Sequence, residues 1–294
     1  MRYWNMDNSN WLDEQRRRFH ATLLASNTLT INPHGVPSNA DKDQKSSVAF
    51  ACHIAQCLEV ATVEERLAGQ TSGGNFENAV KAFIESTFPL LSNLRPGVWE
   101  IKNEGGKRRG GGIANYVPYV HLNGLAQAAK ESPVVATLVG NAYSISPDLV
   151  VLRHPESDQT ISEGGLVLTK GVADYTPLRA ANQERPILHA VISCKWTMRS
   201  DRAQNARSEA LNLMRNRKGR TPHILVVTGE PTPSRISSLA MGTGDVDCVY
   251  HFALPELIEA VETSGNDEAL NLLHIMIEGD RLRDISDLPL DLAI

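Results

Sequence analysis

The hydrophobic positions in the first hundred residues recur with the spacing of α-helices. Apolar residues fall three or four positions apart along residues 11–24, 46–60 and 77–94, which gives each segment one apolar face. Polar, glycine-containing stretches separate these segments at residues 32–43 and 69–75. We predict both stretches to be loops, either plain connections or surfaces where glycine lets a ligand approach the backbone.

After residue 144 the pattern changes to short apolar runs that are typical of buried strands. These runs alternate with segments of helical periodicity, which predicts an α/β or α+β core whose central sheet is flanked by helices. No repeat or low-complexity linker interrupts the chain, so we expect a single domain over residues 1–294, with a helical N-terminal part to about residue 140. The predicted strands are 145–152, 187–196, 223–228 and 248–252, and the predicted helices are 117–130, 200–217, 255–264 and 267–278.

The composition is that of an ordinary globular protein. Of the 294 residues, 41% are hydrophobic and 21% are charged, which is enough to bury a core. No apolar stretch approaches the ~18–20 residues that span a bilayer, and the first residues lack the apolar core of a signal peptide. We therefore expect a cytoplasmic protein with no membrane partner.

The overall charge leaves nucleic-acid binding open. The net charge of −5 gives no sign of it, but a local basic cleft is enough to neutralise phosphates. Lys107, Arg108 and Arg109 precede three glycines in one short basic stretch. This stretch is either a solvated loop or a contact to backbone phosphates.

The four cysteines do not form a familiar pattern. Cys52, Cys57, Cys194 and Cys248 include no pair with CxxC spacing, so neither a disulfide framework nor a zinc site is expected. The segment from Cys52 to Cys57 contains a histidine, but its spacing fits no standard zinc pattern. We interpret it as part of a buried helix.

Three charged residues occupy positions that suit metal-dependent cleavage of a phosphodiester. Asp148 follows a proline at the head of one predicted strand, and Lys195 stands where the next apolar run ends, with 46 residues between them. Glu209 follows after 13 more residues, on a predicted helix. Such cleavage needs carboxylates for a hard divalent cation and a group that orients or activates water or stabilises the charged phosphorane. The set therefore indicates a nuclease core.

Each of these residues also has a plain structural explanation when it is taken alone. Asp148 could cap backbone groups, Lys195 could extend its ammonium to solvent, and Glu209 could lie on a solvated helix face. The ordered set on the expected elements favours the nuclease interpretation over these three.

A cluster of alternating charge follows the lysine-bearing strand. Arginine is the preferred bidentate partner of guanine O6 and N7, and aspartate accepts from cytosine N4. Arg199, Asp201 and Arg202 at a helix start therefore suit a run of G·C pairs in a major groove. The alternative is a capping aspartate between solvated arginines.

The spacing of proline-aspartate, lysine and glutamate resembles that of the PD-(D/E)XK restriction endonucleases. Most of that superfamily carries an acidic residue two positions before the lysine, where this chain has Ser193. The departure matches the subgroup that cuts sites with a CCGG centre, in which a helix glutamate replaces it. The resemblance covers nearly the whole chain, is weakest around 103–112 and 153–180, and is carried by residues 38–41, 65–73, 193–209, 231–236 and 284–292.

The resemblance implies roles for further residues at the catalytic centre. Asp148 and the main-chain carbonyl of Cys194 would coordinate Mg²⁺, and Lys195 would be the catalytic lysine. Glu77 and Glu209 would complete the acidic cluster, with Glu77 also counted among the metal ligands. Periodicity alone would not have selected Glu77.

The resemblance also implies how DNA is recognised. The central CCGG would be read by the arginine and aspartate cluster, and the flanking G·C pair from both grooves. The implied readers are Arg199, Asp201 and Arg202 for the centre, Asp41 and Arg235 for the outer pair, and Gln70 from the minor groove.

The predicted function is that of a type II restriction endonuclease. The resemblance implies Mg²⁺-dependent cleavage of double-stranded DNA within GCCGGC, after the first G, leaving 5′ overhangs. A palindromic site calls for a two-fold dimer, and the resemblance further implies a tetramer that holds two sites. The alternatives are a DNA-binding protein that keeps the fold without cleavage and a structure-specific repair nuclease. The intact acidic residues and lysine argue against the first, and the arginine and aspartate cluster against the second.

Overall fold

The computed structural model describes most of the chain. The backbone alone is described for residues 69–70 and 200–203. The described residues are 11–63, 69–104, 112–139, 145, 147–165, 168–169, 171–198, 200–242 and 244–294.

The described strands form one mixed sheet at the centre of the molecule. Six strands lie in the order β1-β2-β3-β4-β5-β6. Strands β1, β2 and β3 are antiparallel neighbours, whereas β3, β4, β5 and β6 run parallel to one another. Their bounds are β1 (Trp99–Asn103), β2 (Leu149–Arg153), β3 (Ile187–Lys195), β4 (His223–Thr228), β5 (Cys248–His251) and β6 (Leu282–Asp284).

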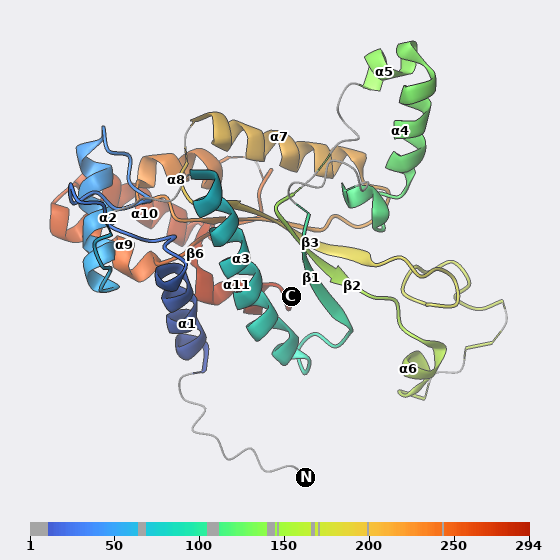
Figure 1. The fold of residues 1–294 in the computed structure, drawn as a ribbon. Helices are drawn as coiled ribbons and strands as arrows, with labels where there is room; N and C mark the ends of the chain where they lie inside the picture. Colours follow the sequence, from blue (N-terminus) through green and yellow to red (C-terminus); the bar gives the residue numbers. More distant parts are fainter. Residues whose placement is uncertain are drawn as a thin grey trace, which may run out of the picture.

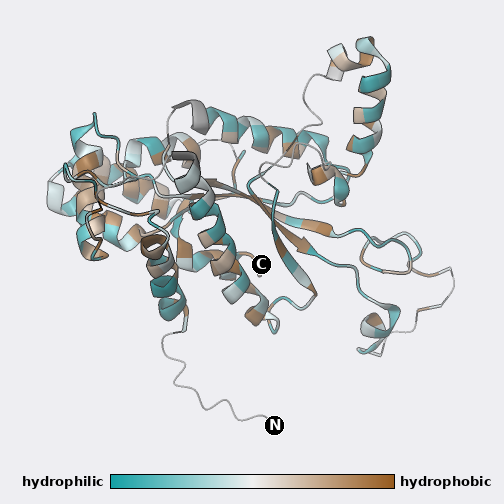
Figure 2. Cartoon of the chain, viewed as in Figure 1, coloured by the Kyte–Doolittle hydropathy of each residue, from teal (hydrophilic) through white to brown (hydrophobic). Residues whose placement is uncertain are grey.

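The central strands are apolar because both faces of the sheet are covered. All residues from Leu149 to Leu152 are fully buried, and so is almost the whole of β3. Burial on both faces explains why these strands are continuous apolar runs with no polar alternation. Figure 2 shows the central strands β2 and β3 as largely hydrophobic and much of the outer helical surface as hydrophilic.

Helices α3 (Gly69–Thr87) and α7 (Ser200–Asn216) lie on opposite faces at β3 (Figure 1). Phe76 of α3 packs on Trp196, with ring centroids 5.0 Å apart. On the other side, Ser193 donates a hydrogen bond from Oγ to Glu209 of α7 over 3.4 Å. These contacts hold α7 against β3 and α3 against the residue that follows it, on the two sides of the sheet seen in Figure 1.

The N-terminal helix α1 (Trp11–Ala25) packs against α3 and is held by one arginine. Arg16 donates to Glu256 at 2.8 Å and to Asp284 at 2.9 Å. Its side chain is 14% exposed, and the two partners come from α9 (Leu254–Ser264) and the end of β6. The paired charges therefore join three elements that are distant in sequence.

The other helices complete the two layers and form two projections. Helix α2 (Lys45–Cys57) packs on α9, and α8 (Pro233–Ala240) packs between α7 and α10 (Asp267–Glu278). Helices α4 and α5 project from the body, as does the β2–β3 connection that contains α6 (Figure 1). The remaining bounds are α4 (His121–Glu131), α5 (Pro133–Val139), α6 (Asp158–Ser162) and α11 (Leu288–Asp291), with short 3₁₀ helices at 88–91, 112–115 and 285–287.

The structure confirms the predicted fold class and most predicted elements, and it corrects several. Residues 69–75, predicted as a loop, form the first two turns of α3. Phe76, Val80 and Phe83 on that helix are buried, and their packing outweighs the low helix propensity of glycine. Helix α4 begins only at His121, and β1 lies within the part predicted to be helical. None of the described helices is long and apolar enough to cross a membrane.

Candidate active site

Asp148 and Lys195 meet at one edge of the sheet. Asp148 directly precedes β2, and Lys195 is the last residue of β3. Because these strands are antiparallel, with Leu149 opposite Ile192, the start of one lies beside the end of the other. Lys195 Nζ donates to Asp148 Oδ2 at 2.8 Å, and both side chains are about one-fifth exposed, at 19% and 21%.

The backbone of Cys194 holds the same carboxylate. Its N–H donates to Asp148 Oδ2 at 2.7 Å. In an extended strand the N–H and C=O of one residue point to the same neighbour, so the Cys194 carbonyl is directed toward the Asp148 side as well. Burial raises the pKa of the Cys194 thiol well above its usual value, and the Asp148 carboxylate raises it further. The side chain is therefore a neutral thiol.

Glu77 faces this edge from α3. Burial raises the pKa of its carboxyl group, the Asp148 carboxylate raises it further, and the Lys195 ammonium lowers it. The side chain is half-buried. Glu77 thus interacts electrostatically with both residues at the strand ends, which the amphipathic pattern of α3 alone did not indicate.

Glu209 approaches from α7 on the other face. Burial raises its pKa to about 7; the Lys195 ammonium opposes this shift, and the Asp148 carboxylate adds to it. Burial lowers the pKa of Lys195, but the Asp148 carboxylate outweighs it, so the net shift is upward. Lys195 is therefore a permanent cation at neutral pH, while Glu209 exchanges a proton near neutrality.

The acidic edge, formed by Asp148, Cys194, Lys195, Glu77 and Glu209, has the chemistry of a hard-cation site. It offers carboxylate oxygens and one backbone carbonyl, the ligands that Mg²⁺ and Ca²⁺ prefer. Three carboxylates face a single ammonium, and burial, with a smaller contribution from the Asp148 carboxylate, raises the pKa values of the two glutamates. A divalent cation would balance it. These residues fit a bound Mg²⁺.

Two of the predicted base readers, Asp41 and Arg235, form an ion pair. Arg235 donates from its guanidinium to the Asp41 carboxylate, and both side chains are about one-third exposed. Asp41 lies just before α2, and its N–H donates to Ser47 Oγ at 2.9 Å. Arg235 lies in the first turn of α8. Residues 194 positions apart are thus brought into contact at the surface.

The buried Glu230 supports this pair and was missed by the sequence analysis. Its side chain is 1% exposed and lies 3.8 Å from the Arg235 guanidinium. It accepts hydrogen bonds from the N–H groups of Met198 at 2.8 Å and Thr232 at 3.2 Å. It therefore connects the end of the lysine-bearing strand to the arginine. A charged residue between Gly229 and Pro231, directly after a buried strand, was the available signal.

Gly229 makes the close packing at this turn possible. A Cβ at this position would lie 2.4 Å from the Trp196 ring and 2.9 Å from the Trp196 carbonyl oxygen. Its own carbonyl accepts from Asn39 Nδ2 at 2.8 Å, which draws the Asp41 loop to the strand ends. Only glycine fits here without moving the backbone.

The other predicted readers cannot be placed by their side chains. Arg199 lies outside the described residues, as do the predicted basic stretch at 107–109 and the segment 64–68. Asp201 and Arg202 belong to the first turn of α7, and Gln70 belongs to the first turn of α3, but only their backbones are described. These four assignments stay predictions.

Comparisons with known proteins give matches over nearly the whole chain. The model of the family described as "NgoMIV restriction enzyme" matches residues 19–294. The type II restriction enzyme NgoMIV of Neisseria gonorrhoeae is 53% identical over 281 residues, covering 96% of this chain and 98% of that protein.

A solved structure of a complex of the restriction endonuclease PspGI with substrate DNA also matches. It is 15% identical, with a TM-score of 0.26, over 96% of this chain and 91% of that one. The family assignment rests on the family model and the sequence identity. The chain belongs to the NgoMIV restriction enzyme family and is a type II restriction endonuclease, a site-specific deoxyribonuclease.

Proposed function

We propose that the acidic edge is the centre at which this endonuclease hydrolyses DNA, with Mg²⁺ held by Asp148, the main-chain carbonyl of Cys194 and Glu77. The observation that carries the proposal is the convergence of the Lys195 ammonium and the Cys194 N–H on one oxygen of Asp148. Among the described residues none donates to the other oxygen, Oδ1, which leaves it open to a cation.

The residues of the edge divide the chemistry between them. Bound Mg²⁺ supplies Lewis-acid polarisation of the scissile phosphate. Lys195, held protonated by Asp148, donates to a phosphate oxygen as negative charge develops, which is electrostatic stabilisation and not base catalysis. Glu209, with a pKa of about 7, is the group that can take up a proton near neutral pH.

For recognition we propose the site GCCGGC, cut after the first G. Arg199, Asp201 and Arg202 would read the central pairs, and Gln70 would reach the minor groove. Support comes from the adjacency of Asp41 and Arg235. Arginine suits guanine and aspartate suits cytosine, so the two groups needed for one G·C pair already lie side by side.

We propose further that the single domain acts in the cytoplasm as a dimer on each palindrome. In a two-fold dimer each subunit reads one half of the site. Two such dimers would form a tetramer that binds two sites. A plasmid with two sites should then be cut faster than a plasmid with one, and a short cognate duplex added in trans should rescue the slow substrate. If a dimer cuts the two plasmids at equal rates, the proposed tetramer is wrong, and the proposed catalytic centre is unaffected.

The decisive experiment compares matched plasmids. One plasmid carries GCCGGC and the other carries the same site with its outer pair exchanged, each with Mg²⁺ or with EDTA. We expect linear product from the first plasmid with Mg²⁺ only, with 5′ ends after the first G by run-off sequencing. Cleavage of both plasmids, or cleavage in EDTA, would contradict the proposed site or the proposed metal.

A further inference from the structure

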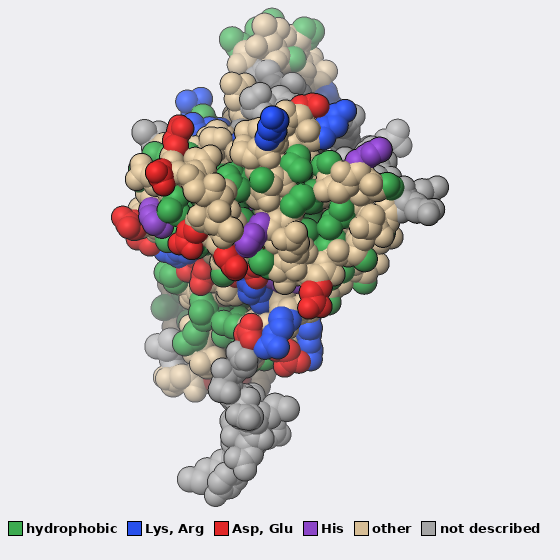
Figure 3. All heavy atoms as spheres, turned by 90° about the vertical axis from the view of Figure 1, so that its left-hand side faces the viewer, with side chains coloured by type: hydrophobic (Ala, Val, Ile, Leu, Met, Phe, Trp, Pro, Cys, Tyr) green, Lys and Arg blue, Asp and Glu red, His purple; other side chains and the backbone are tan. Residues whose placement is uncertain are grey.

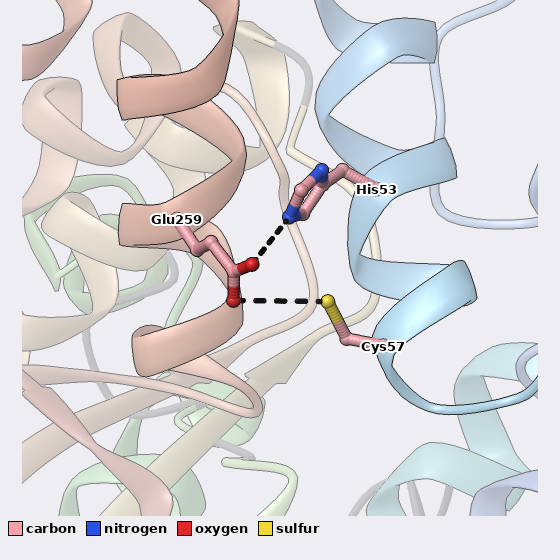
Figure 4. A group of neighbouring side chains, drawn as sticks. All are labelled: His53, Cys57 and Glu259. Carbon is pink, nitrogen blue, oxygen red and sulfur yellow. Dashed lines mark hydrogen bonds and ion pairs between the residues drawn. The ribbon is translucent and has the colours of Figure 1, made fainter.

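A second group of metal-ligating side chains lies between α2 and α9, apart from the acidic edge. His53 and Cys57 are four positions apart, so they lie on one face of α2, and Glu259 points toward them from α9 (Figure 4). The two helices pack against each other. In Figure 3 the side of the molecule that carries these helices faces the viewer, and acidic side chains gather there beside histidine.

The donor atoms of the three residues converge. His53 Nε2 lies 3.5 Å from Glu259 Oε1, and Cys57 Sγ lies 4.0 Å from Glu259 Oε2. One donor from each residue falls within 4.8 Å of the others. Metal–ligand bonds of ~2.0–2.3 Å at tetrahedral angles separate ligand atoms by roughly 3.3–3.8 Å. The His53–Glu259 separation falls in this range, the Cys57–Glu259 separation exceeds it slightly, and no pair exceeds it by more than about 1 Å.

The Nε2 atom of His53 is a buried polar atom that needs a hydrogen-bond or metal partner. His53 Nε2 is closed to solvent and makes no hydrogen bond to a described residue. The 3.5 Å approach of the glutamate is an ion-pair distance and too long for a good hydrogen bond. A buried polar atom without a partner costs stability. A metal ion would satisfy it and draw the carboxylate and the sulfur inward.

The ligand types select the class of metal. Imidazole nitrogen, thiolate sulfur and carboxylate oxygen together suit Zn²⁺ or Co²⁺, whereas Mg²⁺ prefers oxygen ligands alone. We propose that His53, Cys57 and Glu259 bind one Zn²⁺-class ion, with water in the fourth position, and that this ion clamps α2 to α9. The site is independent of the metal at the acidic edge, since the two differ in ligand chemistry and in residues.

A clamp here would bear on DNA recognition through α2. The helix of 13 residues is ~20 Å long, and its first turn holds the Asp41 loop through Ser47. Fixing the far end of α2 to α9 therefore limits the motion of the Asp41 loop. The expected effect is on stability and loop order, while the chemistry of cleavage is untouched.

The test measures metal binding directly on the full-length protein in excess Mg²⁺, which occupies oxygen-only sites. Zn²⁺ is titrated against a chromophoric chelator, and Co²⁺ is used to detect the thiolate-to-metal absorption band. We expect one equivalent bound by the wild type. His53→Ala and Cys57→Ser should each weaken binding on the order of 100-fold or more, and Glu259→Gln should weaken it too.

Cys52→Ser is the matched control. Cys52 lies on the same helix, but its thiol donates to the Gly35 carbonyl at 3.3 Å, so this variant should bind like the wild type. Zn²⁺ should also raise the melting temperature of the wild type and of Cys52→Ser, but not of Cys57→Ser. Equal binding by all variants, or no thiolate band with Co²⁺, would overturn the proposal. In that event the cluster is a plain ion pair beside a free thiol.

Discussion

The acidic edge and the Asp41–Arg235 pair use charge in opposite ways. At the acidic edge three carboxylates face one lysine, and hydrogen bonds from a strand end hold Asp148 in place. Between α2 and α8, Arg235 pairs with Asp41 on a separate segment, and the buried Glu230 carboxylate lies 3.8 Å from the same guanidinium. The first region keeps a charge imbalance that attracts a cation. The second keeps its charges paired until another partner competes for them.

This difference predicts whether a mutation should change the cleavage rate or the discrimination between bases. Groups that act on developing charge change the rate and leave the affinity nearly unaltered. Some groups must break an internal ion pair before they can contact a base. The correct base replaces the lost interaction and an incorrect base does not, so these groups contribute to discrimination. Substitutions in the two regions should therefore separate rate from discrimination.

Asp148→Asn is the change with the largest expected effect. It keeps the shape but removes a metal ligand and the counter-charge of Lys195, so cleavage at saturating Mg²⁺ should fall on the order of 10⁴-fold or more. DNA binding without divalent metal should tighten, because one charge that repels phosphate is gone. Single-turnover cleavage and fluorescence anisotropy measure the two effects. Asp158→Asn, which removes the partly exposed carboxylate that pairs with Arg179 away from the acidic edge, is the control. Turnover within tenfold of wild type would remove Asp148 from the proposed ligands.

Lys195→Ala should lower cleavage on the order of 10³-fold, because an oriented donor to the transition state is lost. Affinity for the cognate duplex should stay within a few-fold of wild type. The matched control is Lys102→Ala on β1, where the ammonium contacts Tyr116 and Glu104. A rate loss below tenfold, ~1.4 kcal/mol, would show that Lys195 only neutralises Asp148.

Arg235→Ala should reduce discrimination at the outer base pair by about 1–3 kcal/mol and leave non-specific affinity nearly unchanged. Asp201→Ala and Arg202→Ala should do the same at the central pairs. Competition anisotropy with duplexes altered one pair at a time measures both quantities. Arg283→Ala, which breaks a pair with Asp291 elsewhere, should change neither. Equal losses on cognate and random duplexes would mean that these side chains contact phosphate.

Glu209→Gln should change how the stability of the metal-free protein depends on pH. The folded-state pKa of about 7 exceeds the ordinary value of 4.5, so between these values the folded state binds more protons than the unfolded state. Stability of the wild type therefore falls as pH rises through this window.

The glutamine variant lacks that loss, so relative to wild type it should gain roughly 1–3 kcal/mol on going from acidic to neutral pH. Urea unfolding at about pH 5 and about pH 8 measures it. A difference that is constant with pH would mean that the Glu209 carboxyl titrates normally.

The sequence was most informative where a charged residue stands at one end of a buried strand. The apolar runs before Lys195 and after Asp148 end at definable residues, so the residue order alone assigns the two to the ends of adjacent strands. Antiparallel pairing then brings them together without a further assumption. The fold class followed from the same alternation of runs and helical periods.

Contacts between distant segments could not be predicted in this way. Glu230 accepts a hydrogen bond from the Met198 N–H and lies near the Arg235 guanidinium. No local sequence pattern reveals that its carboxylate is buried between these two residues. The first turns of α3 looked like a loop because glycine has a low helix propensity, yet Phe76 and its neighbours bury that helix. The spacing of His53 and Cys57 matched no zinc pattern, since their third companion, Glu259, lies 202 residues further on.

Cys194 also determines how the enzyme tolerates oxidants and thiol reagents. Alkylating agents and peroxides attack the thiolate, and burial together with the neighbouring carboxylate keeps this sulfur protonated. All four cysteines are free, and Cys57 is exposed whereas Cys194 and Cys248 are buried. In the metal-free protein, covalent probes should therefore react at Cys57 on α2 first and spare the strand that carries Lys195. A Zn²⁺-class ion bound at Cys57 would slow that reaction, so the labelling rate reports whether the site between α2 and α9 is occupied.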